Sequence, residues 1–315
     1  MTSALLTSRV GASLGETTWG VASIDRDGTD VASRLLPADG DVEIGSISKG
    51  VTAVLYRDAV NRGEVRPGDL LRDHLPLSDC AAGAVTLESL AGHRSGLPRL
   101  PVMPGMLGRT WRMWRHQENP YGDTLDELLE QTRETSVGRP KPAYSNLGFE
   151  LLGHAVAAAV AMPYAELVRE RLAAPLGLDS WYVPATPADL SDSAVAGATR
   201  SGRPAQAWTG EGLGPAGGIR STLTDLASFA AALLEGRAPG IEALEPRAPF
   251  VGSGVRIGDG WITSSVRGRE ITWHNGGTGG WRSFVGLDRS AHRAAVVVRA
   301  STRSVDPVGM ELLAT

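Results

Sequence analysis

The stretch Glu43-Ile44-Gly45-Ser46-Ile47-Ser48-Lys49-Gly50 is the part of the chain around which the other segments are best understood. Ser46 and Lys49 are three residues apart, so in a helix their side chains lie on one face, one turn apart. An apolar stripe follows, and Gly63 fits the residue just past a helix end. The stripe consists of Val51, Val54, Leu55 and Val60. We therefore predict a helix with Ser46 at its N-terminus, where the backbone N–H is free to bind an anion.

The spacing of Ser46 and Lys49 also suggests chemistry. A serine hydroxyl is a weak nucleophile until a base takes its proton, and a lysine can do so when burial or nearby charge lowers its pKa. Of the 31 Lys and Arg residues, only Lys49 and Lys141 are lysines. Arginine cannot give up its proton in a protein, whereas lysine can. This bias favours a proton-transfer role for Lys49, and a chance Ser-x-x-Lys on a helix is the structural alternative.

Composition excludes several classes of protein. A chain of 315 residues with a net charge of −4 has no overall attraction for nucleic acid or for an anionic membrane. Cys80 is the only cysteine, which excludes an intramolecular disulfide. The first 20 residues lack the pattern of a signal peptide, and no run of about 18 apolar residues occurs. We expect a cytoplasmic protein with a small-molecule substrate and neither a nucleic-acid nor a membrane partner.

The order of predicted elements indicates an α+β fold. Alternating patterns predict strands at 17–24 and 31–36 and again from residue 256 onward, and helical patterns fill the middle of the chain. The late strands are expected at 256–266, 270–274, 283–288 and 294–300. Strands at both ends most simply form one antiparallel sheet flanked by helices. We assign residues 1–65 and 205–315 to this sheet domain and residues 66–204 to an inserted all-helical domain.

Helix signals divide the middle of the chain. Thr124 and Glu127 form a capping box before an amphipathic segment, and Thr222 caps a later one that Gly236 ends. Further helices are expected at 86–91, 147–161, 163–174 and 308–313. The segment from Arg109 to His116 is the most basic and aromatic in the chain. One short segment is too small for a nucleic-acid interface. We interpret it as a loop or lid beside a pocket, or as a packed helix.

Two further stretches are candidates for site residues. Tyr144-Ser145-Asn146 follows a proline-rich turn, so the tyrosine can exchange a proton and the asparagine can donate to an acyl carbonyl. The structural alternative is a helix N-cap. The run from His274 to Gly280 ends a strand, and its glycines allow backbone N–H groups to approach an oxyanion. The alternative there is a glycine-rich hairpin turn. His93 is interpreted as a structural, hydrogen-bonded histidine in preference to a member of a catalytic triad.

Ser46-x-x-Lys49, Tyr144-x-Asn146 and His274-x-Gly276, in this order, resemble the three motifs of the serine β-lactamase and penicillin-binding-protein superfamily. The similarity is greatest to class C β-lactamase-like serine hydrolases, a branch with esterases, D-aminopeptidases and acyltransferases. It extends over residues 18–300. Three flanking stretches match as well: Leu90-Ala91-Gly92-His93-Arg94-Ser95-Gly96-Leu97, Pro175-Leu176-Gly177-Leu178-Asp179 and Gly217-Gly218-Ile219-Arg220-Ser221-Thr222-Leu223-Thr224-Asp225-Leu226.

The resemblance implies an active site between the sheet and the helical domain. It implies that Ser46 is the acylated nucleophile and that Lys49 and Tyr144 transfer protons. Asn146 would position the substrate, with His274 and Gly276 beside it in the third motif. The backbone N–H groups of Ser46 and Gly277 would form the oxyanion hole. No metal or organic cofactor is implied.

One departure from the family bears on the substrate. His274 occupies the position where β-lactamases and D,D-peptidases usually carry a lysine that binds a substrate carboxylate. A histidine is mostly neutral at pH 7. We therefore do not expect a β-lactam or D-Ala-D-Ala substrate.

We expect a serine acyl-enzyme hydrolase that acts on an ester or amide. An acyltransferase of specialised metabolism, passing the acyl group to an amine or alcohol, is the alternative within enzymes, and a non-turnover acyl sensor is the alternative outside them. A dry, aromatic cleft mouth would favour transfer by excluding water and stacking an acceptor. The candidates for such a mouth are Trp111, Trp114, Trp208 and Trp281.

Overall fold

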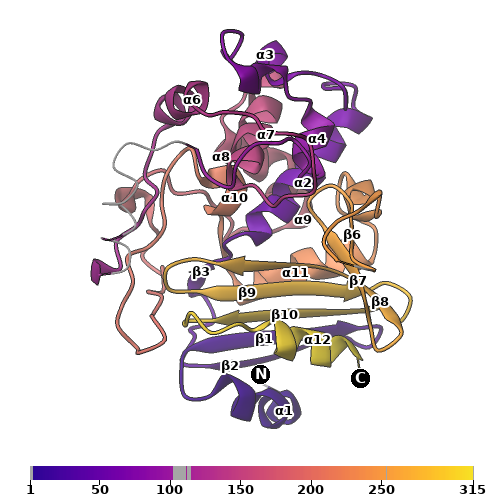
Figure 1. Cartoon of the computed structure of the whole chain (residues 1–315). Coiled ribbons are helices and arrows are strands. Elements are labelled where there is room, and N and C mark those ends of the chain that lie inside the picture. The colour runs from indigo at the N-terminus through magenta and orange to yellow at the C-terminus, as the bar shows by residue number, and fades with distance from the viewer. Residues whose placement is uncertain (1–2, 102–110, 112–114, 253, 315) are drawn as a thin grey trace.

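An eight-stranded antiparallel sheet forms the base of the molecule in the computed structural model, which describes residues 3–101, 111, 115–252 and 254–314 (Figure 1). In sheet order its strands are β2 (Gly28–Arg34), β1 (Trp19–Asp25), β10 (Arg293–Arg299), β9 (Arg282–Asp288), β8 (Arg269–Gly277), β7 (Ile262–Val266), β6 (Arg256–Ile257) and β5 (Ala248–Pro249). The pairing of β1 with β10 joins the two ends of the chain. The predicted sheet, built from both ends, is confirmed.

Helices cover both faces of this sheet. α11 (Leu223–Leu234) packs on one face against β1, β9 and β10, whereas α1 (Ala4–Leu14) and α12 (Asp306–Ala314) pack on the other. Side chains of β10 alternate between the faces, because successive residues of a strand point to opposite sides. Val296 and Val298 join the main hydrophobic cluster on the α11 side, and Val297 joins the second cluster with α1 and α12. The sheet is therefore buried on both sides at its centre.

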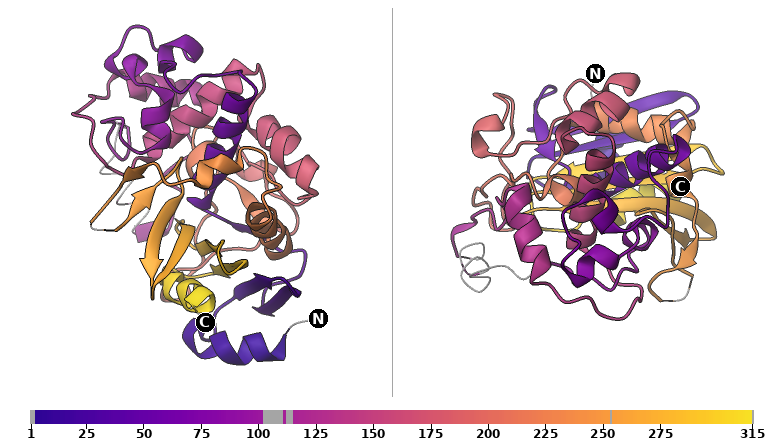
Figure 2. Two further views of the ribbon diagram at one scale, coloured as in Figure 1. Left: turned by 90° about the vertical axis from the view of Figure 1, so that its right-hand side faces the viewer. Right: turned by 90° about the horizontal axis from the view of Figure 1, so that it is seen from above.

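The remaining α-helices of the described residues gather above one edge of the sheet (Figures 1 and 2). They are α2 (Ile47–Asn61), α3 (Leu71–His74), α4 (Leu87–Ala91), α6 (Leu125–Arg133), α7 (Asn146–Ala159), α8 (Tyr164–Val168), α9 (Ala174–Leu176) and α10 (Gly214–Gly217). The predicted helix after Ser46 is confirmed as α2, and Gly63 follows its end with φ +72°. α2 packs against α7, α10 and strand β8, so it links the helical part to the sheet.

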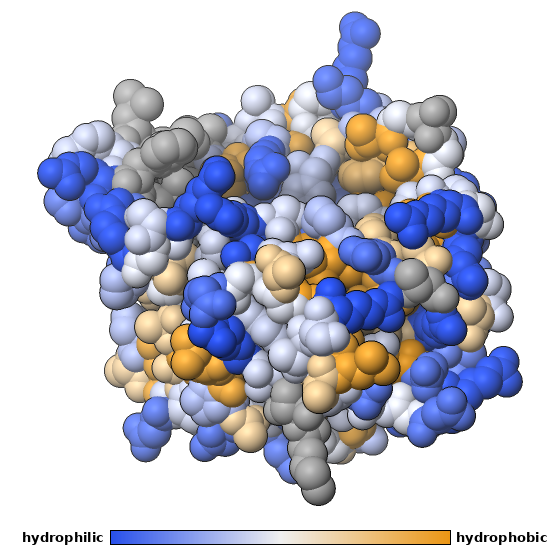
Figure 3. All heavy atoms as spheres, turned by 90° about the horizontal axis from the view of Figure 1, so that it is seen from below, coloured by the Kyte–Doolittle hydropathy of each residue, from blue (hydrophilic) through white to orange (hydrophobic). Residues whose placement is uncertain are grey.

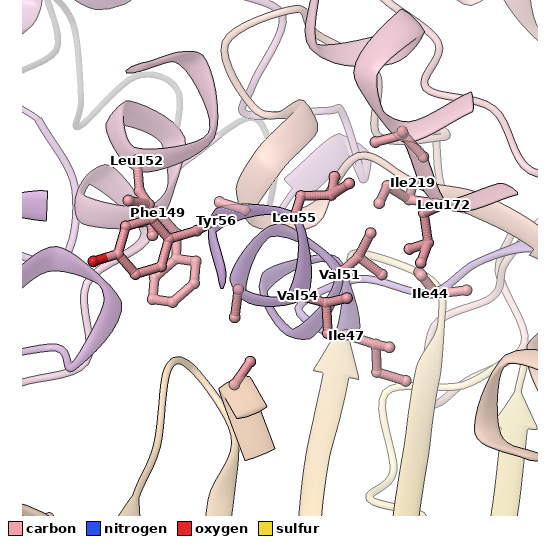
Figure 4. Packing of buried hydrophobic residues seen from close by; sticks show 14 of the residues in the cluster. Ile44, Ile47, Val51, Val54, Leu55, Tyr56, Phe149, Leu152, Leu172 and Ile219 are labelled. Atoms are coloured by element: carbon pink, nitrogen blue, oxygen red, sulfur yellow. The ribbon is translucent and has the colours of Figure 1, made fainter. Parts of the chain in front are cut away.

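The predicted apolar stripe on α2 was too narrow. Every residue from Ile47 to Tyr56 is buried, and their side chains point in several directions, toward Phe149 and Leu152 of α7 and toward Ile219 (Figure 4). A helix that is surrounded by other elements is buried all round. This one cluster contains side chains from both predicted domains. The boundaries at residues 65/66 and 204/205 stay a prediction.

Several elements differ from the sequence-based expectation. Helix α1 was not predicted, although Ser3 caps it and Leu6, Val10 and Leu14 are its buried face. A two-stranded sheet of β3 (Asp41–Glu43) and β4 (Arg220–Thr222) was also missed, because three-residue strands have no detectable periodicity. The expected helix at 163–174 is interrupted by a π-helical turn at Arg169–Ala173. The expected strand at 256–266 is two strands, β6 and β7.

Among the helices in the described ranges, none is both long and apolar enough to cross a membrane by itself. The segments Asn146–Ala159 and Tyr164–Leu176 meet that length and composition only as a pair, and they are bent by 80° relative to each other. The face of the molecule seen from below carries separate apolar patches with hydrophilic residues between them (Figure 3).

Candidate active site

Ser46 and Lys49 lie where helix α2 meets the sheet. Ser46 is the N-cap residue of α2 and is partly exposed, whereas the Lys49 side chain one turn later is completely buried. Lys49 Nζ is 3.2 Å from Ser46 Oγ and also donates to the carbonyl oxygen of Ala216 in α10. Burial lowers the pKa of Lys49, because the charged form loses its hydration. This geometry gives the serine a neighbouring amine that can accept its proton.

The backbone at Gly45, just before Ser46, lies in close contact with the end of strand β8. Gly45 adopts φ +53°, and a Cβ placed on it would lie 2.7 Å from the nitrogen of Gly277. Strand β8 continues beyond its pairing with β7, which stops at Trp273, so residues 274–277 have no strand partner on that side. Thr278 N donates to Trp281 O, so the adjoining pair Gly277–Arg282 is a non-hydrogen-bonded pair of the antiparallel ladder. In such a pair the N–H of Gly277 points away from β9. The Gly277 N–H therefore faces the N-terminus of α2.

Tyr144 precedes helix α7 and lies over the Lys49 amine. Lys49 Nζ is 5.0 Å from the Tyr144 ring centroid, and the Arg99 guanidinium carbon is 5.3 Å from it. Burial raises the pKa of Tyr144 to about 12, and the Ser46 hydroxyl and the Arg99 charge offset this rise only in part. The ring is therefore a neutral phenol near neutral pH. The fold thus brings Tyr144, which is distant in sequence, to Ser46 and Lys49.

His93 packs against Tyr144 and binds the backbone of the next residue. Its Nδ1 accepts a hydrogen bond from Ser145 N at 3.2 Å, and its ring lies 4.6 Å from the Tyr144 ring, centroid to centroid. Burial and the nearby Lys49 lower its pKa well below the usual range, so the ring is neutral. Among the described hydrogen bonds, none joins His93 to Ser46. The prediction of a structural, hydrogen-bonded histidine is confirmed.

Asn146 begins helix α7 just behind the cleft. Its Nδ2 donates to Tyr121 Oη at 3.1 Å, while its Oδ1 is buried without a hydrogen-bond partner. Ser145 takes the N-cap role, because its Oγ accepts from Gly148 N. The second motif thus caps a helix and also places a free amide oxygen in the site.

His274 is completely buried and does not reach the cleft surface. Its Nδ1 donates to the carbonyl oxygen of Asn275 at 2.7 Å, and its Nε2 has no partner. Burial and the Lys49 charge lower its pKa to about 3. His274 therefore supplies no positive charge to the cleft, which agrees with the expected neutral side chain, and its predicted role in substrate binding stays a prediction.

A cleft of about 1150 Å³ opens above Ser46. Tyr144, Gly276 and Gly277 line it, together with arginines described below. Of the four tryptophans proposed for its mouth, Trp208 lines the cleft and Trp114 lies outside the described residues. The prediction for Trp281 was wrong, because this ring is completely buried against Gly197 and offers no surface to an acceptor. Trp111 is 60% exposed and packs on His116, and it is not among the lining residues.

Sequence reasoning missed a buried carboxyl group near Lys49. Glu150 lies in the second turn of α7, which begins at Asn146, and is nearly inaccessible to solvent. Burial raises the pKa of Glu150, and its negative charge in turn opposes the lowering of the Lys49 pKa. A charged residue inside the otherwise apolar run Leu147–Leu152 was the available signal.

A second missed feature is the ion-pair network below the third motif. Arg220 of β4 pairs with Asp41 of β3 and lies 3.7 Å from Glu43. Glu43 accepts hydrogen bonds from Thr278 Oγ1 and from Trp208 N. This network ties the strand before Ser46 to the turn that follows Gly277. In the described part of the chain, no group of three or more His, Cys, Asp or Glu side chains is arranged to hold a metal ion.

The sequence profile of the beta-lactamase family matches residues 7–312. Among curated proteins, the chain is 29% identical over 181 residues to the D-alanyl-D-alanine-carboxypeptidase/endopeptidase AmpH of Escherichia coli (strain K12), covering 56% of this chain and 43% of that protein. It is 25% identical over 302 residues to the unguisins hydrolase ungD' of Aspergillus campestris, covering 85% of this chain and 54% of that protein. The chain therefore spans about half the length of these relatives.

Solved structures share the fold at low sequence identity. A beta-lactamase/D-alanine carboxypeptidase from Pseudomonas syringae superposes with a TM-score of 0.80 at 18% identity, covering 98% of this chain and 95% of that one. A D-stereospecific amidohydrolase from Streptomyces sp. superposes with a TM-score of 0.81 at 19% identity, covering 98% and 97%. The order of the motifs, the fold and the family match agree, and the chain therefore belongs to the beta-lactamase family of serine hydrolases.

Proposed function

We propose that this enzyme cleaves an ester or amide through an acyl-enzyme formed on Ser46. The observation that carries the proposal is the Lys49 amine, which is completely buried and lies 3.2 Å from Ser46 Oγ. A buried amine with a lowered pKa is a base at neutral pH, whereas an exposed lysine is not.

The steps of acylation follow from this geometry. Lys49 Nζ takes the Ser46 proton as Oγ attacks the substrate carbonyl carbon, and the carbonyl oxygen becomes an oxyanion. The N–H groups of Ser46 and Gly277 stabilise that oxyanion. The proton passes to the leaving group through Tyr144, whose phenol is neutral and beside Ser46. The C–O or C–N bond then breaks, leaving an ester on Ser46.

Deacylation reverses the proton transfers. Water attacks the Ser46 ester and gives its proton to the Tyr144–Lys49 pair, and Ser46 regains a proton as the acid product leaves. Asn146 would position the acyl side of the substrate, with its unpartnered Oδ1 accepting a hydrogen bond from a substrate N–H.

We infer the substrate class from the names of the similar proteins. Their names describe a carboxypeptidase, an amidohydrolase and a hydrolase of unguisins. Cleavage of an amide or a related ester by this chain fits all three. An acyl sensor without turnover is less well supported, because both Lys49 and Tyr144 are in place for deacylation.

The first test is the covalent adduct. A fluorophosphonate probe should label the wild-type protein on Ser46 alone, because no other serine has a buried lysine amine beside its hydroxyl in the described chain. The Ser46→Ala variant should lose labelling and turnover of a panel of esters and amides. Peptide mapping identifies the labelled residue. An adduct on another serine, or wild-type turnover by Ser46→Ala, would refute the proposal.

Acyl transfer is the second candidate, and Trp208 in the cleft wall is the observation that favours it. Its exposed part could stack an amine or alcohol acceptor and raise the local acceptor concentration above that of competing water. The acyl-enzyme should be formed with an activated ester, and acceptors titrated. Saturable diversion into the transfer product, reduced in Trp208→Ala, supports transfer. A product ratio that stays hydrolytic for all acceptors leaves hydrolysis as the function.

A further inference from the structure

The walls of the Ser46 cleft are cationic, although the whole chain carries a net charge of −4. Among the described residues, five arginines line the cleft, against one carboxylate, Asp306. The arginines are Arg99, Arg200, Arg203, Arg282 and Arg303. They come from separate parts of the chain, so no single basic segment reveals them. A cleft lined by one sign of charge concentrates ligands of the opposite sign.

These arginines are free of carboxylate partners in the described structure. None of the five lies within ion-pair distance of an Asp or Glu side chain among the described residues. Exposed arginines elsewhere in the chain do form such pairs, as Arg289 does with Glu245 and Arg237 with Glu235. The positive charge in the cleft is therefore available to a ligand.

Arg282 is the best placed of the five. It begins β9 directly opposite Gly277 in the β8–β9 register. A Cβ placed on Gly277 would lie 2.9 Å from Arg282 Nη1 and 3.2 Å from Nε, so the guanidinium rests against the residue whose N–H faces Ser46. Its Nη1 donates to the carbonyl oxygens of Thr278 and Trp281, each at 2.8 Å. The head group is thus fixed beside the oxyanion position.

The outer edge of the same guanidinium has no partner. Within the described residues, neither Nε nor Nη2 of Arg282 makes a hydrogen bond, and Asp306 attracts the group without forming an ion pair with it. Two parallel N–H donors at that edge match the two oxygens of a carboxylate. His274 nearby is neutral and buried and cannot serve the same purpose.

We propose that Arg282 binds an anionic group of the substrate, a carboxylate, next to the scissile carbonyl, with the other four arginines attracting that substrate into the cleft. This inference rests on the proposed acyl-enzyme function and names its substrate class. The competing explanation is that Arg282 only ties down the turn of residues 278–281 through Nη1.

The experiment compares matched acid and neutral substrates. In one pair, meta-acetoxybenzoate and meta-acetoxybenzamide, the carboxylate or the neutral amide is on the leaving group. The other pair, the para-nitrophenyl esters of adipic acid and of its monoamide, carries it on the acyl group. We expect the acid to be preferred in kcat/KM by about tenfold to a hundredfold in at least one pair, the value of one charge-assisted contact. Raising the ionic strength from about 0.01 M to about 1 M should shrink that preference.

Substitutions at Arg282 test whether this residue causes the preference for the acid substrates. Arg282→Gln should bring the acid-to-neutral ratio close to one, and Arg282→Lys should restore only part of it, because an ammonium lacks the planar fork. Arg26→Gln, at an exposed hairpin turn, removes the same charge and should keep the wild-type ratio. Circular dichroism checks folding. Should Arg282→Gln not fold, the lysine variant and the salt series in the wild type decide the matter.

The outcomes separate the two proposals. If the wild type hydrolyses the neutral esters but shows no acid preference in either pair, or if the preference survives in Arg282→Gln, the anion subsite is refuted and the acyl-enzyme function stands. If the wild type hydrolyses none of the four esters and Ser46 is not labelled by a fluorophosphonate, the function itself fails.

Discussion

At the scale of single residues, the chemistry depends on one lysine that is isolated from water. Lys49 is completely buried, its Nζ contacts Ser46 Oγ and the Ala216 carbonyl, and its neighbours His93 and His274 are neutral. The free energy of charging the amine is therefore raised, and its proton is easily lost. The chain's preference for arginine elsewhere agrees with a specific requirement for lysine here.

Lys49→Arg should reduce kcat by about 10²-fold or more, although the positive charge is kept, because arginine does not release its proton. Steady-state kinetics with an activated ester measure the loss. Lys141→Arg is the matched control, since Lys141 is exposed, and its kinetics should equal those of the wild type. Near-wild-type turnover by Lys49→Arg would exclude Lys49 as the base.

The pH profile tests the electrostatics of the same amine. Because burial lowers the pKa of Lys49, kcat/KM should be high above that lowered pKa and fall as the pH drops through it and the amine becomes protonated. Glu150 raises the Lys49 pKa through its negative charge. Glu150→Gln removes this charge, so the acidic limb of the profile should move to lower pH. A limb that stays in place, or moves to higher pH, contradicts the coupling of the two groups.

At the scale of elements, the oxyanion position is produced by the close approach of two backbones. Gly277 at the end of β8 touches Gly45, the residue before Ser46, with no room for a side chain between them. Ser283 Oγ holds the Ile44 carbonyl at 2.7 Å on the same side. The helix N-terminus and the strand end are thus held in register.

Gly45→Ala should lower kcat by about 10²-fold, because the added Cβ would lie 2.7 Å from Gly277 N and φ +53° is unfavourable for alanine. Gly63→Ala, at the other end of α2, is the control. Its φ of +72° is also unfavourable, but nothing lies within 4 Å of its Cβ. That variant should lose stability, by about 1 kcal/mol, and keep its turnover. Equal turnover of the two variants would disprove the close-approach explanation.

At the scale of the whole molecule, a buried ion-pair network connects the sheets to the site. Arg220 neutralises Asp41 and lies near Glu43, and Glu43 holds Thr278 just after the oxyanion strand. Tyr182 Oη and Ser191 Oγ also donate to Asp41, which brings the long loop after α9 into the same network. Removing one member leaves the others buried with uncompensated charge.

Arg220→Met should therefore destabilise the protein by about 3–5 kcal/mol, as expected for breaking a buried pair on one side. Arg256→Met, which removes an exposed pair with Glu270, should cost only about 0–1 kcal/mol. Urea unfolding at neutral pH compares the two variants. Similar midpoints would show that the buried network contributes no more than a surface pair.

The local features of this protein are encoded in short stretches of its sequence. The caps at Thr124 and Thr222, the helix opened by Ser46 and the alternation in β10 were predictable because capping and periodicity are encoded within a few residues. The structural, hydrogen-bonded role of His93 was also predicted correctly.

Tertiary packing, in contrast, sets which distant residues meet. Trp281 is three residues past Thr278 in sequence but turns into the core, while Arg282 beside it faces the cleft, because the strand register and not the composition sets the direction of each side chain. The coupling of Glu150 to Lys49 depends in the same way on the packing of α7 against α2. Charge and burial at the site are properties of several segments together, so no local pattern specifies them.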